Sequence, residues 1–130
     1  MASKTLAKNR KARVEYEIQK TMEVGIVLQG TEVKSIRAGQ INLAESYCRV
    51  DDSLQVYLLN AHISQYDFGN RHNHEPLRPR RLLLHRSEIR RLYGQVKEQG
   101  LTLIPLKIYL KGGIIKMEFY KKLCFGLSGR

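Results

Sequence analysis

The residue types that hold metals are present in this sequence, but their spacing does not fit a metal site. His72 and His74 lie two positions apart, without the paired cysteines or the helical i, i+4 spacing of zinc sites. The two cysteines, Cys48 and Cys124, are 124 − 48 = 76 positions apart and form no C-x-x-C motif. We therefore predict that the chain binds no metal and that both cysteines are reduced and structural.

Signatures of catalysis and of nucleotide binding are absent from the sequence. It contains no G-x-x-x-x-G-K-[ST] loop, no G-x-G-x-x-G after a predicted strand and no G-x-S-x-G elbow. The sequence thus predicts a protein that is not an enzyme and that uses no cofactor.

Positive charge is the strongest signal in the composition. The chain has 23 Lys and Arg against 12 Asp and Glu, which gives a net charge of +11 over 130 residues. Residues 66–130 contain 14 of these basic residues and five of the acidic ones. A charge of this size implies an anionic partner, and nucleic acid is the predicted class.

A dense block of arginines begins after residue 70, and its members are Arg71, Arg78, Arg80, Arg81, Arg86, Arg90 and Arg91. Just before it, Tyr66, Phe68 and Asn70 offer stacking surfaces and an amide that reads base edges. Tyr66 and Phe68 could equally anchor their loop to the fold. We interpret the mixture as a surface for structured RNA, with the histidines as polar loop residues that contact RNA or solvent. A generic single-strand-binding module and a small RNA-modifying enzyme or nuclease are the alternatives.

The hydrophobic pattern predicts the elements that must position these residues. Apolar residues alternate over residues 14–18, 24–28, 46–50, 54–58, 101–110 and 115–119, which indicates about six short strands. A short helix is predicted at residues 32–38, capped by Thr31, and a longer one from a His85–Glu88 capping box to Gly100. Pro105 marks a strand edge or a bulge.

These elements favour a mainly β fold in a single domain. The predicted architecture is an OB-fold-like Greek-key antiparallel barrel with two or three short flanking α-helices, and a ferredoxin-like α+β fold is the competitor. No segment approaches the roughly 18 apolar residues of a membrane helix, and no secretory signal is seen. We therefore expect a cytoplasmic protein without membrane contact.

Five long runs of the sequence, spread over residues 9 to about 117, resemble the small protein B family, the partners of transfer-messenger RNA in trans-translation. They are N-R-K-A-R at 9–13, G-I-V-L-Q-G-T-E-V-K-S-I-R-A-G at 25–39, H-I-S-Q-Y at 62–66, G-N-R-H-N-H-E-P-L-R-P-R-R-L-L-L-H at 69–85 and G-L-T-L-I-P-L-K-I-Y at 100–109. The resemblance implies an OB-fold barrel that grips the tRNA-like domain of this RNA. It also implies an adapter that delivers the RNA to the A site of stalled ribosomes, beside 16S rRNA, as ribosome rescue. Elongation factor Tu and alanyl-tRNA synthetase would be indirect partners through the same RNA.

By position, the family's RNA-binding residues correspond to Asn9, Glu23 and Leu83, although core packing is an equal explanation for Leu83. The further residues expected to contact phosphates are Lys11, Arg13, Lys34, Arg37, Arg78, Arg80 and Arg81. We expect a basic N-terminal segment at 1–13 and one RNA-binding barrel at 14–122. Residues 123–130 would be a C-terminal end from which the family's basic tail is absent.

Overall fold

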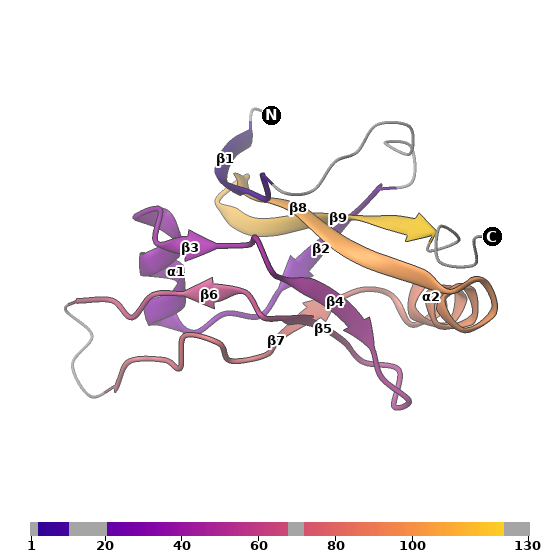
Figure 1. Cartoon of the computed structure of the whole chain (residues 1–130). Helices are drawn as coiled ribbons and strands as arrows, with labels where there is room; N and C mark the ends of the chain where they lie inside the picture. The colour runs from indigo at the N-terminus through magenta and orange to yellow at the C-terminus, as the bar shows by residue number, and fades with distance from the viewer. Residues whose placement is uncertain (1–2, 11–20, 68–71, 124–130) are drawn as a thin grey trace.

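The computed structural model of the chain describes residues 3–10, 21–67 and 72–123 (Figure 1). Within these ranges the elements are β1 (Ser3–Lys8), β2 (Thr21–Ile26), α1 (Gly30–Arg37), β3 (Ile41–Asn42), β4 (Tyr47–Val50), β5 (Val56–Leu59), β6 (His62–Ile63), β7 (Arg80–Leu83), α2 (Arg86–Gln99), β8 (Leu101–Lys111) and β9 (Ile114–Leu123). The strand predicted at 14–18 lies outside the described residues, as do Lys11, Arg13, Phe68, Asn70 and Arg71.

The main sheet closes into an antiparallel barrel. Its neighbouring strands run in the order β8-β4-β5-β7-β2-β9, and pairing between β8 and β9 completes this ring of six strands within the described residues. The mainly β, OB-fold-like barrel predicted from the sequence is therefore confirmed. The short strands β3 and β6 form a separate two-stranded ladder.

Strand β8 is long enough to pair with three neighbouring strands, β1, β4 and β9. Its first part pairs with β4 through Cys48 and Leu103, and its last part, from Lys107 to Lys111, pairs with β1. Strand β1 therefore extends the sheet from residues that the sequence analysis assigned to a segment preceding the barrel. The register between β8 and β9 shifts between Pro105 and Lys107, which is the predicted bulge.

Two helices lie at opposite ends of the barrel (Figure 1). Helix α2 begins after His85, whose capping box with Glu88 is present as predicted, and ends at Gly100 in the left-handed conformation. Helix α1 begins two residues earlier than predicted, because Gln29 rather than Thr31 is its N-cap residue. The Thr31 hydroxyl instead lies 2.8 Å from Nδ1 of His74. Neither helix is long and apolar enough to cross a membrane, within the ranges described.

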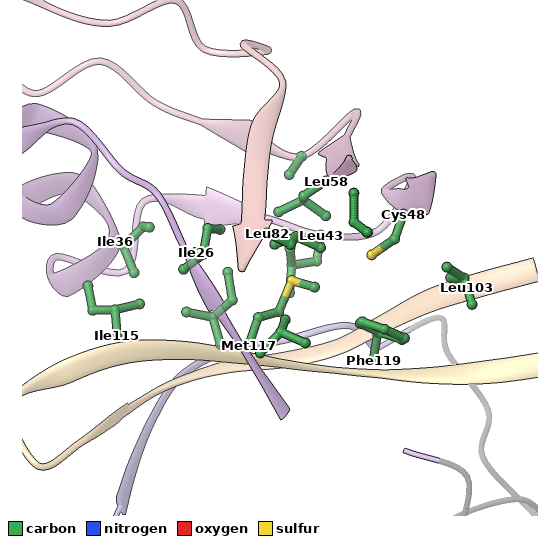
Figure 2. Close-up of a cluster of buried hydrophobic side chains, with 14 of the residues drawn as sticks. Ile26, Ile36, Leu43, Cys48, Leu58, Leu82, Leu103, Ile115, Met117 and Phe119 are labelled. Carbon is green, nitrogen blue, oxygen red and sulfur yellow. The ribbon is translucent and has the colours of Figure 1, made fainter. Parts of the chain in front are cut away.

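The core fills the barrel and extends beneath α1. Figure 2 shows side chains from α1, β2, β7 and β9 converging, among them Ile36, Ile26, Leu82 and Met117. All four are at most 9 % exposed. Because alternate residues of β2 and β7 point into this core, the intervening residues of both strands must face outward.

Candidate nucleic-acid interface

The outward face of β2 and β7 brings together two of the predicted RNA-binding residues. On β2, Val24 is buried, whereas Glu23 before it faces solvent. Gly25 on β2 pairs directly with Leu83 on β7. Glu23 and Leu83 are 60 positions apart in sequence but share one face of two paired strands, with Glu23 two residues before the Gly25–Leu83 pair.

Leu83 lies on the surface and is not part of the core. Its side chain is 50 % exposed, and it packs across Gly25, where an added Cβ would lie 3.4 Å from both Cβ and Cδ1 of Leu83. Val27, which follows the last residue of β2, is 44 % exposed. Leu83 and Val27 are thus apolar side chains on the outside of the barrel, which suits contact with the apolar faces of bases or riboses.

Glu23 is held in place by two residues from β8. The hydroxyl of Tyr109 donates a hydrogen bond to Oε2 of Glu23, and Nζ of Lys111 lies 3.2 Å from the same oxygen. The hydrogen bond from Tyr109, together with Lys111, holds the pKa of Glu23 below its ordinary value despite partial burial. Glu23 is therefore ionised at neutral pH and remains 35 % exposed, so it can accept a hydrogen bond from a 2′-hydroxyl or a base amine.

Near Glu23 the face carries several lysines and one further acid, because Glu118 of β9 is the direct partner of Glu23 in the ladder and lies 4.0 Å from Nζ of Lys107. Lys116 on β9 is paired with Gly25, and Lys107 on β8 lies 5.3 Å from the centre of the Tyr109 ring. Sequence reasoning missed Lys107, Tyr109, Lys111 and Lys116. The sequence predicted a strand at 101–110, but only the pairing of the β8–β9 hairpin with β2 places these side chains near Glu23, where Tyr109 is only 5 % exposed.

The arginine block of the sequence is divided by the fold, and the phosphate contact expected of Arg80 is wrong. The Arg80 side chain is completely buried, and its Nε donates to Oε2 of Glu32 at 2.7 Å. Its other nitrogens donate to the carbonyls of Ala61, Pro76 and Glu75 at 2.8 to 3.2 Å. Arg80 alternates with outward-facing Arg81 along β7, and its position on the core side explains the difference.

Glu32 on α1 is the centre of this buried ion-pair cluster. Its Oε1 accepts from Nη2 of Arg78 at 2.6 Å and from the backbone N–H of Gln29 at 2.8 Å. Burial by itself raises the pKa of Glu32, but the hydrogen bonds from Arg78, Gln29 and Arg80 outweigh burial and hold the pKa below its ordinary value. Arg78 remains 29 % exposed, so part of its guanidinium faces solvent. The cluster joins α1 to the sheet and to the segment before β7.

Lys34 and Arg37 are both exposed on α1 and thus lie on a different element from the β2–β7 face. Nζ of Lys34 lies 5.6 Å from the centre of the Tyr66 ring, a cation–π distance. Asn73 holds the backbone of Tyr66 through two hydrogen bonds, of 3.0 and 2.6 Å. These contacts support the reading of Tyr66 as an anchor of its loop.

Asn9 is buried at the end of β1, and its amide is used inside the protein. Its backbone N–H donates to the carbonyl of Leu106 at 2.8 Å, and Nδ2 donates to that of Pro105 at 2.9 Å. Both carbonyls belong to the β8 bulge, where the register between β8 and β9 shifts. Asn9 therefore supplies hydrogen-bond donors to these two carbonyls in place of the shifted β8–β9 ladder. This side chain fastens β1 to β8, and it is only 8 % exposed.

His74 departs from the expectation of a polar loop histidine that touches RNA or solvent. It is 2 % exposed, and its ring nitrogens lie 2.8 Å from the Thr31 hydroxyl and 2.8 Å from the carbonyl of Ile63. It therefore ties the segment before β7 to α1 and β6. Among the described residues, no cluster of His, Cys, Asp or Glu has the arrangement of a metal site.

Comparison with known proteins gives one consistent result. The SmpB protein family profile matches residues 6–124. The SsrA-binding protein of Geobacillus thermodenitrificans (strain NG80-2) is 56 % identical over 115 residues, which cover 88 % of this chain and 74 % of the relative. That of Desulforudis audaxviator (strain MP104C) has the same identity and coverage. A solved structure described as "tmRNA-SmpB: a journey to the center of the bacterial ribosome" is 47 % identical, with a TM-score of 0.69 over 88 % of this chain and 80 % of that one.

Proposed function

The chain belongs to the SmpB protein family, and we propose on that premise that it binds transfer-messenger RNA and acts with it on the ribosome in trans-translation. The family is one of RNA-binding adapters, so the protein's task is to hold and place an RNA rather than to transform it. The outward β2–β7 face, where Glu23 and Leu83 lie together among lysines, is the observation that carries the proposal.

The chemistry of this face favours a structured RNA over an arbitrary polyanion. A fixed, ionised carboxylate repels phosphates, and it therefore contributes only where a donor such as a 2′-hydroxyl meets it. The apolar surface of Leu83 requires an unstacked base or a ribose edge beside that donor. Lys111 and Lys116 supply the phosphate attraction that such a contact needs. A structured RNA such as the tRNA-like domain of transfer-messenger RNA, whose loops present bases and 2′-hydroxyls beside phosphates, offers this combination.

The contact residues follow from exposure and position. Glu23 and Leu83 would read the RNA, while Arg81, Lys111 and Lys116 would neutralise phosphates on the same face. Four further cations are proposed as phosphate contacts outside that face: Lys34 and Arg37 on α1, and Lys11 and Arg13 in the N-R-K-A-R run. Arg78 contributes with the exposed part of its guanidinium, whereas Asn9 and Arg80 act by holding the fold.

As an adapter, the protein would deliver the tRNA-like domain to the A site of stalled ribosomes, beside 16S rRNA. Elongation factor Tu and alanyl-tRNA synthetase would meet it only through the RNA. In this role the barrel replaces the part of a tRNA that normally pairs with a codon, so its RNA face must hold the tRNA-like domain rigidly. The ring of six strands that the described residues form, closed by the pairing of β8 with β9, supplies such rigidity.

A competition experiment tests the proposed function. The protein is bound to a fluorescent single-stranded oligonucleotide, and unlabelled tRNA-like RNA or unlabelled single strand of equal length is added at moderate salt. We expect the tRNA-like RNA to displace the probe at a much lower concentration. Equal competition by both RNAs would identify a general single-strand-binding module instead.

A further inference from the structure

The bulge in strand β8 decides which of its side chains face outward. On β9, Met117 and Phe119 are two residues apart, and both lie in the core. Their partners on β8, Ile108 and Pro105, are three residues apart, because Leu106 is an extra residue in β8. Two residues of one strand thus lie opposite one residue of the other, which is the geometry of a β-bulge.

The bulge reverses the inward and outward positions along the rest of β8. Before it, Pro105 is buried on the core side. Because side chains alternate between the two faces of a strand, a regular strand would continue this phase and turn Tyr109 and Lys111 toward the core. After the bulge Ile108 takes the core position instead, so Tyr109 and Lys111 reach Glu23 on the outward face. The contacts that hold Glu23 therefore depend on the bulge.

Asn9 supplies two donors to the backbone of the bulge. Neighbouring carbonyls of a regular strand point toward different neighbours. Here the carbonyls of Pro105 and Leu106 both accept from Asn9, the first from Nδ2 at 2.9 Å and the second from the backbone N–H at 2.8 Å. A buried carbonyl that loses its donor costs free energy, and Asn9 is only 8 % exposed. Removal of the side-chain amide therefore weakens the bulge relative to a regular strand.

The position of Asn9 lets it act on a strand with which it does not pair. Before the bulge β8 pairs with β4, and after it Lys107 of β8 pairs with Lys8 of β1. Asn9 directly follows Lys8 and so lies where β8 exchanges one neighbour for the other. Strand β1 is joined to β8, and β2 is joined to β9. A change at Asn9 thus reaches Glu23 through the β8–β9 hairpin.

We propose that Asn9 is a positioning residue for RNA recognition: by holding the β8 bulge, its amide fixes the side chains that orient the carboxylate of Glu23. This inference rests on the proposed function, in which Glu23 contacts the tRNA-like RNA. Both donors of Asn9 are bound to β8 carbonyls, so their effect on the RNA passes through Glu23. Without the amide, the carboxylate has to be ordered when the RNA binds, and this ordering lowers the affinity.

Two substitutions and their combination test the proposal. Asn9→Ala removes the side-chain donor, and Glu23→Gln removes the charge that the bulge is proposed to orient. The matched control is Ser46→Ala, because the buried Ser46 hydroxyl donates to the carbonyl of Leu43 at 2.6 Å, outside the bulge. Each protein is measured for binding to the tRNA-like domain and for urea unfolding. A carboxyl NMR titration of the free protein gives the pKa of Glu23 wherever that residue is kept.

We expect Asn9→Ala to weaken binding of the tRNA-like domain by about two- to tenfold, which corresponds to the loss of one hydrogen bond. It should also raise the pKa of Glu23, because the hydrogen bond from Tyr109 contributes most to lowering that pKa. In the Glu23→Gln protein the same substitution should change binding by less than about twofold, because the charge through which it acts is absent. Ser46→Ala should lower the unfolding free energy without changing the affinity or the titration of Glu23.

Two results would overturn the inference. One is an equal loss of binding from Asn9→Ala with and without the Glu23 carboxylate, and the other is an unmoved titration of Glu23 in Asn9→Ala. Should Asn9→Ala not fold, Asn9→Gln keeps an amide on a longer stem, and the same two results decide. Failure of the unchanged protein to prefer the tRNA-like RNA would instead refute the proposed function, while the titration of Glu23, which uses no RNA, would still test the role of Asn9.

Discussion

The buried Glu32–Arg80 pair yields the largest stability effect that we expect from any single side chain. In Glu32→Ala, the N–H of Gln29 and the guanidinium groups of Arg78 and Arg80 lose their acceptor. Arg80 has no exposed surface and would keep its charge among backbone carbonyls alone. Removing one partner of a buried pair costs about 3–5 kcal/mol, a large part of the roughly 5–15 kcal/mol that stabilises a domain.

Urea unfolding followed by circular dichroism measures this loss. The matched control is Glu118→Ala, because Glu118 is 27 % exposed and its oxygen lies 4.0 Å from Nζ of Lys107. A surface pair of this kind contributes about 0–1 kcal/mol. Should Glu32→Ala unfold completely, Glu32→Gln keeps the shape and one acceptor and gives a measurable, smaller loss. A loss for Glu32→Ala as small as that for Glu118→Ala would refute the assignment of Arg80 to a buried structural role.

The pH dependence of stability gives an independent check on Glu32. Its pKa in the folded protein lies below the ordinary value of 4.5, so its stabilising contribution is complete above that value. The contribution is lost as the pH falls through the lower, folded-state pKa. The difference in unfolding free energy between the unchanged protein and Glu32→Gln should therefore shrink as the pH falls below about 4.5. A difference that does not change with pH would contradict the ion pair.

Three further outcomes follow from the β2–β7 face. Tyr109→Phe removes the hydrogen bond that contributes most to lowering the pKa of Glu23, so a carboxyl NMR titration of the free protein should find that pKa raised; an unmoved titration would show that Tyr109 does not hold the carboxylate. Leu83→Ala should lower the unfolding free energy by less than about 1 kcal/mol, because Leu83 is half exposed, and should weaken binding to the tRNA-like domain by about fivefold or more. A loss of unfolding free energy as large as the loss of binding free energy would show that Leu83 acts as a core residue. Arg81→Gln should make the salt dependence of RNA binding shallower by about 0.7–0.9 at unchanged stability, and an unchanged slope would show that Arg81 points away from the phosphates.

Local patterns in the sequence were sufficient for both helices and for β2, β4, β5, β8 and β9, but they did not predict β1, β3, β6 or β7. The His85–Glu88 capping box, the stop at Gly100 and the bulge at Pro105 are decided by neighbouring residues, and each was predictable from them. The start of α1 was not, because Thr31 is an equally good cap residue in sequence and is drawn instead to His74, 43 positions away. Choices that depend on a distant partner leave no local signal.

In the candidate site, too, the features decided by neighbouring residues were predictable and those decided by distant partners were not. The outward positions of Glu23 and Leu83 follow from strand alternation once the strands are known. Arg80 and Arg81 differ only in phase along β7, and a buried position for Arg80 becomes possible only because Glu32 of α1 lies beneath it. The sequence alone led us to predict both arginines as surface charges that contact phosphates. Tyr109 was missed for the same reason, since its partner Glu23 is 86 positions away and is brought near by β9.

An NMR titration of the full chain with the tRNA-like RNA domain tests the central claim most directly. The claim is that the RNA lies on the outward face of β2 and β7, beside the β8–β9 hairpin. We predict that the largest shifts occur at the Leu83 methyl groups and at the amides of Glu23 and Gly25, while core methyl groups such as those of Ile36 remain unchanged. Saturable binding without shifts on β2 and β7, or with the largest shifts on α2, would contradict the account.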